Sequence, residues 1–168
     1  GLDFNRNFST RQEQIRAFEA QLEIAIDLQK PVFLHQRDAH DDFVAIIKSC
    51  RSDLGQLVAH CFTGSIEEFN DFVILDMYIG VTGWICDERR GASLQQAVKH
   101  IPLDRIMIET DAPYLLPRDL QEKPAEKNRN EPCYLPHIAK AVAKHMEIEE
   151  SQLITAAYNN SCDFFKLN

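Results

Sequence analysis

Four short apolar runs, separated by helical patterns, constrain the fold of this chain more than any other feature. They are PVFLH at residues 31–35, QLVAHCF at 56–62, MYIGVTG at 77–83 and RIMIETD at 105–111. Each run has the length of a buried strand, and the segments between them carry apolar residues every three or four positions, as amphipathic helices do. Strands that alternate with helices build parallel βα units, so we predict an α/β fold with about four parallel strands and flanking helices.

The apolar spacing also places the helices. The first is expected to begin at the capping-box residues Ser9 and Thr10 and to stop before Pro31. Apolar positions mark three more helices between the runs, and two further helices fit residues 134–145 and 149–165. The irregular stretch at 112–132 holds four of the seven prolines and is too long for a routine connection, so we expect it to form a functional lid or rim. No domain boundary is visible within residues 1–168.

Charge and cysteine usage exclude several classes of protein. A formal net charge of −8 argues against a protein that binds long duplex DNA by neutralising many phosphates. No apolar run approaches the roughly 20 residues of a membrane span, and the first residues lack the pattern of a signal peptide. The five cysteines are widely spaced and odd in number, which indicates free thiols. We therefore expect a cytoplasmic protein without membrane partners.

Three of the apolar runs carry, at or near their ends, a side chain that can bind a metal. His35 closes PVFLH, His60 lies in LVAHCF and Asp111 closes IMIETD. In a parallel barrel the carboxyl ends of the strands converge on one face, so these residues can surround one ion. Two imidazoles and a carboxylate suit Zn²⁺, Mn²⁺ or Fe²⁺, and also Mg²⁺ where further carboxylates and water contribute. Each residue alone is more often structural, but their recurrence at strand ends favours a metal centre.

Strand alternation separates the neighbours of these residues. Glu109 has the same parity as Asp111 and is the second candidate carboxylate, either orienting a ligating histidine or acting as a general base. Cys61 is expected to point away from the face of His60 and to be a small packed hydrophobe. The remaining histidines are expected to be solvated or capping residues without a functional role: His40, His100, His137 and His145.

Several motifs together resemble the TatD family of metal-dependent deoxyribonucleases. They are GLDFNRNFS at 1–9, PVFLHQRDAH at 31–40, AHCFTG at 59–64, YIGVTGW and CDERRG within 78–91, IETDAPYLLPRDL at 108–120 and RNEP at 129–132. They occur in the family's order and cover essentially the whole chain. The resemblance implies the C-terminal part of a (β/α)₈ TIM barrel of the metal-dependent hydrolase type, as a single domain over residues 1–168.

The resemblance also implies roles for individual residues. His35 matches the histidine of the family's HxR motif, His60 that of its HCF-type motif, and Asp111 the aspartate of its ETDxPY motif. All three resemble metal ligands, and Asp111 is also implied to be catalytic, accepting a proton from the attacking water. Three residues match motifs that border the site and are implied to bind substrate: Arg37, Arg129 and Glu131. Lys127 is expected to be surface charge.

One departure from the family pattern concerns the rest of the site. The family's HxH histidines and the Glu of its GExGLD motif precede the position of Gly1, so residues 1–168 hold neither. A whole barrel needs about 250 residues, and this chain should form about half of its wall. We therefore expect open strand edges, exposed side chains on the inner face, and little activity from these residues alone.

The function implied by the resemblance is divalent-metal-dependent hydrolysis of phosphodiester bonds in DNA, as in a 3′–5′ exonuclease involved in DNA repair. The implied cofactor is Mg²⁺, with Zn²⁺ or Mn²⁺ as alternatives, and the implied partner is single-stranded DNA or a 3′ end. Two other interpretations stay open. One is a metal-dependent amidohydrolase that acts on a small-molecule amide or ester, and the other is a non-catalytic fragment. The sequence does not indicate the oligomeric state.

Overall fold

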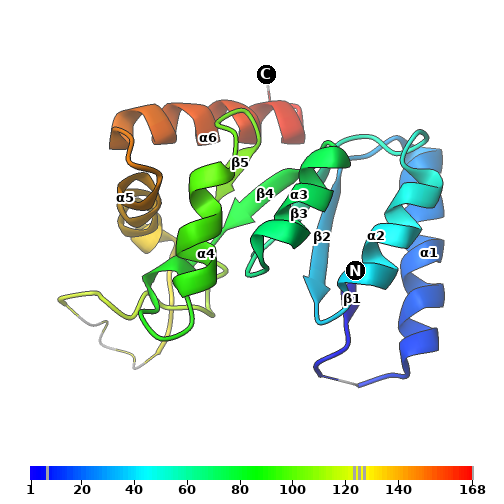
Figure 1. Cartoon of the computed structure of the whole chain (residues 1–168), viewed down its shortest axis with the longest axis horizontal. Coiled ribbons are helices and arrows are strands. Elements are labelled where there is room, and N and C mark those ends of the chain that lie inside the picture. The colour runs from blue at the N-terminus through cyan, green and yellow to red at the C-terminus, as the bar shows by residue number, and fades with distance from the viewer. Residues whose placement is uncertain (7, 123, 125, 127, 168) are drawn as a thin grey trace.

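The chain forms one parallel sheet with the strand order β1-β2-β3-β4-β5, seen in Figure 1. The structure is a computed structural model that describes residues 1–6, 8–122, 124, 126 and 128–167. The strands are β1 (Leu2–Asp3), β2 (Val32–Arg37), β3 (Leu57–His60), β4 (Tyr78–Val81) and β5 (Ile106–Ile108). The prediction of parallel βα units is confirmed. The sheet has one strand more than the sequence pattern shows, because the two residues of β1 are too few to produce an alternation.

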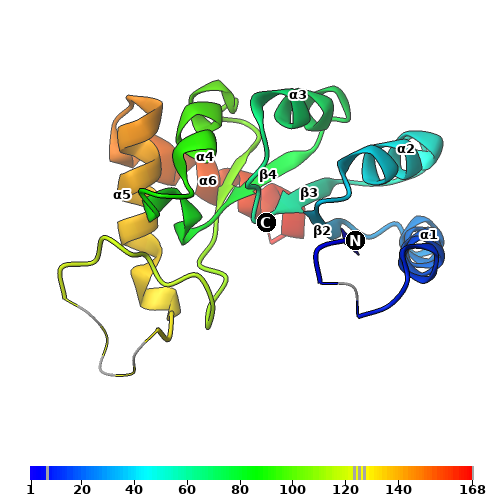
Figure 2. The same cartoon turned by 60° about the horizontal axis from the view of Figure 1, so that its bottom comes forward.

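Helices fill every connection between successive strands. They are α1 (Arg11–Leu28), α2 (His40–Cys50), α3 (Ile66–Ile74) and α4 (Ala92–Ala97), and after β5 come α5 (Leu135–Met146) and α6 (Glu150–Phe165). Short 3₁₀ turns lie at η1 (Gly83–Cys86), η2 (Val98–His100) and η3 (Pro132–Tyr134). Figure 2 shows α1, α2 and α3 side by side along the sheet. No helix in the described ranges is long and apolar enough to cross a bilayer.

The first helix shows how the sequence sets these boundaries. Thr10 accepts a hydrogen bond from the N–H of Glu13, and the Glu13 carboxylate accepts one from the N–H of Thr10, which completes the predicted capping box. The helix buries Phe18 and Leu22, and the ring of Phe18 stacks on that of Phe43 in α2 with 5.4 Å between centroids. Packing against α2 and the sheet thus fixes the apolar face that the sequence periodicity predicts.

Helix α6 covers part of the inner face of the sheet. Its Phe164 packs with Val58, Tyr78 and Met107 from three neighbouring strands. Its Asn160 donates hydrogen bonds of 2.8 Å to the carbonyl oxygens of Leu103 and Ile106, where β5 begins. Phe33 of β2, which pairs with Val58, is 52% exposed on the same face, as expected for an incomplete barrel wall. The inner face is therefore covered over β3, β4 and β5 and open over β2.

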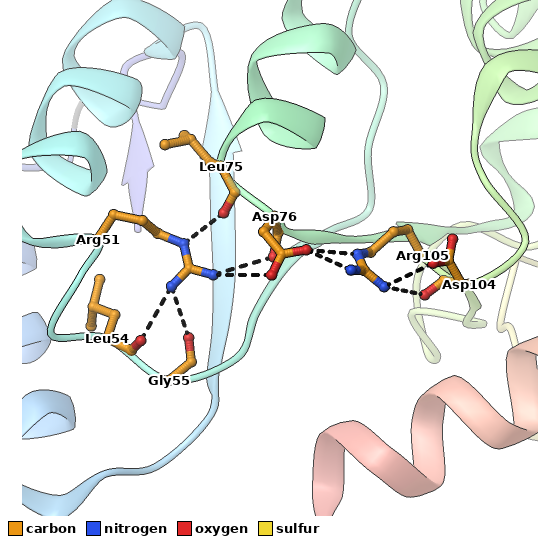
Figure 3. Close-up of polar contacts among 7 residues, drawn as sticks. All are labelled: Arg51, Leu54, Gly55, Leu75, Asp76, Asp104 and Arg105. Carbon is orange, nitrogen blue, oxygen red and sulfur yellow. Dashed lines mark hydrogen bonds and ion pairs between the residues drawn. The ribbon is translucent and has the colours of Figure 1, made fainter.

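A polar network ties together the connections that enter β3, β4 and β5 (Figure 3). The guanidinium of Arg51, after α2, donates to four backbone carbonyls, those of Leu54, Gly55, Leu75 and Asp76. Arg105, before β5, donates to the Asp76 carboxylate at 2.6 and 2.9 Å. Carbonyls at helix ends otherwise lack partners. The network therefore fixes the starts of β3, β4 and β5 relative to one another. Because these strands are short, it also helps to position their carboxyl ends, where the candidate site lies.

Candidate metal centre

The carboxyl ends of β2, β3 and β5 bring the expected ligands to one face. His35 and His60 are paired residues of β2 and β3, and their ring centroids lie 6.1 Å apart. Asp111 lies three residues after β5, in a left-handed backbone conformation with φ of 57°. Its Oδ1 lies 3.5 Å from Nε2 of His60. The structure thus brings His60 and Asp111 together and places His35 beside them.

His35 has a carboxylate neighbour that the sequence analysis missed. Its Nε2 lies 3.4 Å from Oδ2 of Asp3 at the end of β1. The other carboxylate oxygen of Asp3 accepts hydrogen bonds from the N–H groups of Asn5 and Arg6, which fix its orientation. Burial lowers the pKa of His35, although Asp3 opposes this effect. Asp3 ends β1, but a strand of two residues gives no sequence signal.

Glu109 orients His60. Its Oε2 lies 2.6 Å from Nδ1 of His60, and its Oε1 accepts a hydrogen bond of 2.9 Å from the N–H of Cys61. A Cβ atom on Gly80, in β4, would overlap Oε1 of Glu109, so this contact depends on a glycine there. Burial lowers the pKa of His60, but the carboxylates of Glu109 and Asp111 outweigh it and the net pKa is raised. The contact at Nδ1 leaves Nε2 of His60 facing Asp111, which is the arrangement of a metal-ligating histidine held by a carboxylate.

The expected orientation of Cys61 is wrong. Strand alternation placed its side chain away from His60, but Cys61 has a left-handed backbone with φ of 49°, which breaks the alternation as β3 ends. Its Sγ lies 3.3 Å from the Thr82 hydroxyl. Donor atoms of Cys61, His60 and Asp111 all lie within 4.8 Å of one another. Burial raises the pKa of the Cys61 thiol to about 11, so it is protonated at neutral pH when no cation is bound.

An open cleft of about 340 Å³ lies directly in front of these residues. Its lining includes three arginines, Arg6, Arg37 and Arg90, together with Trp84. The guanidinium of Arg90 lies over the Trp84 ring, 4.4 Å from its centroid. Arg37 thus lies where the sequence analysis expected a substrate-binding residue. The lining also includes the carboxylates of Asp38, Glu68 and Asp111, so the cleft offers both cationic and anionic groups.

The loop that contains the RNEP motif lies beside the strand end but contributes less directly than expected. Arg129 forms an ion pair of 2.8 Å with Glu126. Within the part of the chain that the structure describes, neither Arg129 nor Glu131 lines the cleft, and their substrate-binding roles stay predictions. Lys127 lies outside the described residues. Asn130, between Arg129 and Glu131, is buried. It donates hydrogen bonds of 2.7 Å to the carbonyls of Thr110 and Tyr114, which anchors the loop around Asp111.

Two histidines without an expected role have carboxylate partners instead of the solvated or capping positions predicted for them. Nε2 of His40 lies 3.0 Å from Oδ2 of Asp71 in α3. Nε2 of His137 lies 2.7 Å from Oδ1 of Asp119 in the long loop. Both partners are distant in the sequence, so periodicity could not reveal them.

The donors at the strand ends fit a divalent cation. Imidazole nitrogens and a carboxylate oxygen are ligands that Zn²⁺ and Mn²⁺ accept, and the open side of the cleft leaves room for water and substrate oxygens. A parallel α/β sheet with such donors at its carboxyl ends defines the class: part of a (β/α)₈ barrel of the hydrolase type. The family model described as TatD related DNase matches residues 1–166. The chain belongs to the TatD family.

Curated relatives and solved structures agree with this assignment. The chain is 52% identical, over 167 residues, to a 3′-5′ ssDNA/RNA exonuclease TatD of Pectobacterium atrosepticum, and the match covers 99% of the chain and 64% of that relative. A protein of the same name from Citrobacter rodentium is 55% identical over 157 residues, with 94% and 59% covered. The chain thus spans about three fifths of the length of these relatives.

The solved structures show the same fold at lower identity. A TatD family hydrolase from Entamoeba histolytica superposes with a TM-score of 0.86 at 27% identity, covering 98% of this chain and 60% of that one. An uncharacterized amidohydrolase from Saccharomyces cerevisiae superposes with a TM-score of 0.84 at 26% identity, covering 98% and 63%. The expected family and the expected barrel-type fold are therefore confirmed.

Proposed function

We propose that this chain provides one wall of a divalent-metal centre that hydrolyses phosphodiester bonds at the 3′ ends of single-stranded DNA. The observation that carries the proposal is the placement of His60 and Asp111, 3.5 Å apart, at the edge of a cleft lined by arginines. The curated relatives named 3′-5′ ssDNA/RNA exonucleases support it and make single-stranded RNA a second substrate to test. Single-stranded ends need few contacts, and the arginines of the cleft can supply them in a chain whose net charge is negative.

The residues of the site divide the work between holding the cation and moving a proton. His35, His60 and Asp111 would hold the ion, and Glu109 keeps Nε2 of His60 aimed at it. When bound, the cation supplies Lewis-acid activation of water and of the phosphoryl group. Asp111, whose Oδ1 lies 3.5 Å from Nε2 of His60, would also accept a proton from the attacking water. We propose Mg²⁺ as the cofactor, with Zn²⁺ or Mn²⁺ as alternatives.

The cleft wall would bind the nucleic acid. Arg6, Arg37 and Arg90 can donate to phosphate oxygens, and guanidinium groups do so in bidentate fashion. Trp84 lies in the same wall with the guanidinium of Arg90 over its ring, and this pair of planar groups can contact a terminal base. These contacts do not read the base sequence. We therefore propose a preference for single strands of any sequence, in the cytoplasm and in the context of DNA repair.

The proposal is tested with 5′-labelled single-stranded DNA and RNA, incubated with the protein and each of the three cations. Stepwise shortening from the 3′ end is expected, with a loss of at least roughly 100-fold in the Asp111→Asn and His60→Ala variants. His100→Ala changes an exposed histidine outside the cleft and serves as the matched control. Residues 1–168 contain neither HxH nor GExGLD, so the rate is expected to be low. Near-normal cleavage by either site variant contradicts the assigned roles.

The structural likeness to an amidohydrolase keeps a second reaction under test. The same donors could activate water toward an amide or ester carbonyl. A panel of small amides and esters, assayed with the same variants, separates the two reactions. Cleavage of amides without cleavage of phosphodiesters would favour this alternative. Absence of both, together with no stoichiometric metal, would favour a non-catalytic fragment.

A further inference from the structure

A second group of metal-binding side chains lies outside the cleft. Cys86 ends η1, Asp119 lies in the long loop after β5, and His137 lies in the first turn of α5. One donor atom from each of the three side chains lies within 4.8 Å of the other two. Within the described ranges, none of the three lines the cleft in front of His60. This group is therefore separate from the candidate metal centre.

The fold holds the three side chains in place through their neighbours. Asp87, next to Cys86, is buried, and Nε of Arg118 lies 3.0 Å from its Oδ2. Because Arg118 directly precedes Asp119 and Asp87 directly follows Cys86, this ion pair fixes the loop in a position where Asp119 lies beside Cys86. His137 comes from α5, which packs against η1, and its Nε2 lies 2.7 Å from Oδ1 of Asp119. Three segments distant in the sequence thus converge through the Asp87–Arg118 ion pair, the packing of α5 against η1 and the contact between His137 and Asp119.

The chemistry of the group favours a borderline-soft divalent cation. A thiolate, an imidazole and a carboxylate are ligands that Zn²⁺ binds, and Zn²⁺ commonly takes four ligands in a tetrahedron. Cys86 is 5% exposed, whereas the side chains of Asp119 and His137 are 44% and 32% exposed. One side of the group is thus closed by the protein, and the other is open for the entry of an ion and for a water as fourth ligand.

Such a group could instead contain a catalytic cysteine, with Cys86 as the nucleophile, but the geometry disfavours this interpretation. A nucleophilic thiol needs a histidine as its base, yet Nε2 of His137 faces the Asp119 carboxylate. Burial and the charge of Asp119 raise the pKa of the Cys86 thiol to about 12, opposite to the lowered pKa of reactive cysteines. The thiol is therefore a poor nucleophile.

We propose that Cys86, Asp119 and His137 bind a Zn²⁺ ion that fastens the long loop to η1 and α5. Binding replaces the thiol proton of Cys86, which leaves to solvent, with a sulfur–zinc bond. The loop holds the residues that follow Asp111, and η1 holds Trp84 of the cleft wall. The ion thereby stabilises the rim of the cleft without taking part in hydrolysis.

Cobalt substitution tests this site directly, because Co²⁺ bound to a thiolate has a near-ultraviolet charge-transfer band that Co²⁺ on nitrogen and oxygen ligands lacks. The protein is titrated with Co²⁺ under reducing conditions. The band is expected in the unaltered chain, in Cys162→Ser and in Cys61→Ser, which removes the thiol beside the candidate centre in the cleft. It is expected to be lost when Cys86→Ser is added to Cys61→Ser. Absence of the band from Cys61→Ser, or its retention in the variant with both Cys61→Ser and Cys86→Ser, overturns the proposal.

Variants of the two more accessible ligands cover the case in which Cys86→Ser does not fold. His137→Ala and Asp119→Asn are each expected to weaken Co²⁺ binding at this site at least tenfold, and to abolish the increase in thermal midpoint that Zn²⁺ gives the unaltered chain. His145→Ala, on the same helix, is the matched control and is expected to change neither. Unchanged Co²⁺ affinity in both ligand variants overturns the proposal, and it does so whether or not the chain cleaves DNA.

Discussion

Gly80→Ala tests the link between the shape of the sheet and the orientation of His60. The added methyl group would occupy the position of Oε1 of Glu109 and would approach its Cδ to 2.9 Å. The carboxylate must then move, and it loses its contacts with Nδ1 of His60 and with the N–H of Cys61. Replacing a glycine of β4 by alanine should thus alter the contacts that Glu109, after β5, makes with His60 and Cys61 at the end of β3.

The magnitude follows from these two contacts. Hydrogen bonds to a charged group contribute roughly 1.5–3 kcal/mol each. Alanine in a strand is favoured over glycine by about 0.5–1 kcal/mol. The Glu109 side chain is 18% exposed and regains some hydration when it is displaced. We therefore expect Gly80→Ala to lower the free energy of unfolding by about 2 kcal/mol and to weaken metal binding roughly 10- to 100-fold through the loss of His60 orientation.

Urea unfolding in the presence of a chelator measures the first quantity, and calorimetric titration with Mn²⁺ measures the second. Gly55→Ala is the matched control, because a Cβ there would make only ordinary van der Waals contacts with the carbonyl group of Lys30, at 3.7 and 3.9 Å. In a Glu109→Ala background the obstruction is gone, and Gly80→Ala should be neutral or stabilising. Equal losses of stability in the two backgrounds would show that Gly80 does not act through Glu109.

Three further predictions concern the scaffold, each measured by chemical unfolding. Arg51→Ala should lower the free energy of unfolding by about 3 kcal/mol, because four carbonyls lose a charged donor. Lys48→Ala removes an exposed ion pair and should lower it by less than about 0.5 kcal/mol. Similar losses in the two variants would contradict the role of the network. Burial raises the pKa of Asp87, but N–H and guanidinium groups of neighbouring arginines outweigh it and lower the pKa below 3.8. The ionised carboxylate of Asp87 therefore stabilises the fold above pH 3.8, and this stabilisation is lost as the pH falls through the folded pKa. The unaltered chain and Asp87→Asn should thus approach the same free energy of unfolding in acid. A difference that stays constant with pH would contradict this role of Asp87. Thr10→Ala should lower the free energy of unfolding by about 1 kcal/mol by removing the cap of α1, and Ser9→Ala should leave it almost unchanged. Equal losses would show that Thr10 is not the capping residue.

Local signals in the sequence were sufficient for most of the fold. The Thr10 and Glu13 capping box and the proline before β2 fixed the ends of α1, and the apolar runs located four strands within two or three residues. These features depend on neighbours along the chain, so one sequence can reveal them. The two-residue β1 could not be predicted, because it is defined by pairing with Gln36 and Arg37.

The candidate site was predictable in part for the same reason. His60 and Asp111 lie near the ends of apolar runs, and strand parity correctly placed Glu109 on their face. Parity failed at Cys61, since a single left-handed residue turns the side chain toward the site. The contacts of Asp3 with His35 and of Asp119 with His137 join residues that are distant in sequence. Only the folded arrangement reveals such pairs.

We propose that the carboxyl ends of β2, β3 and β5 form a divalent-metal centre. Calorimetric titration with Mn²⁺ tests it most directly, because Mn²⁺ prefers nitrogen and oxygen donors and discriminates against a thiolate site. The unaltered chain should bind one Mn²⁺ at this centre, and a variant with both His60→Ala and Asp111→Ala should bind it roughly 100-fold more weakly or not at all. His100→Ala should bind as the unaltered chain does. Equal Mn²⁺ affinity in the unaltered chain and the double variant would contradict the account.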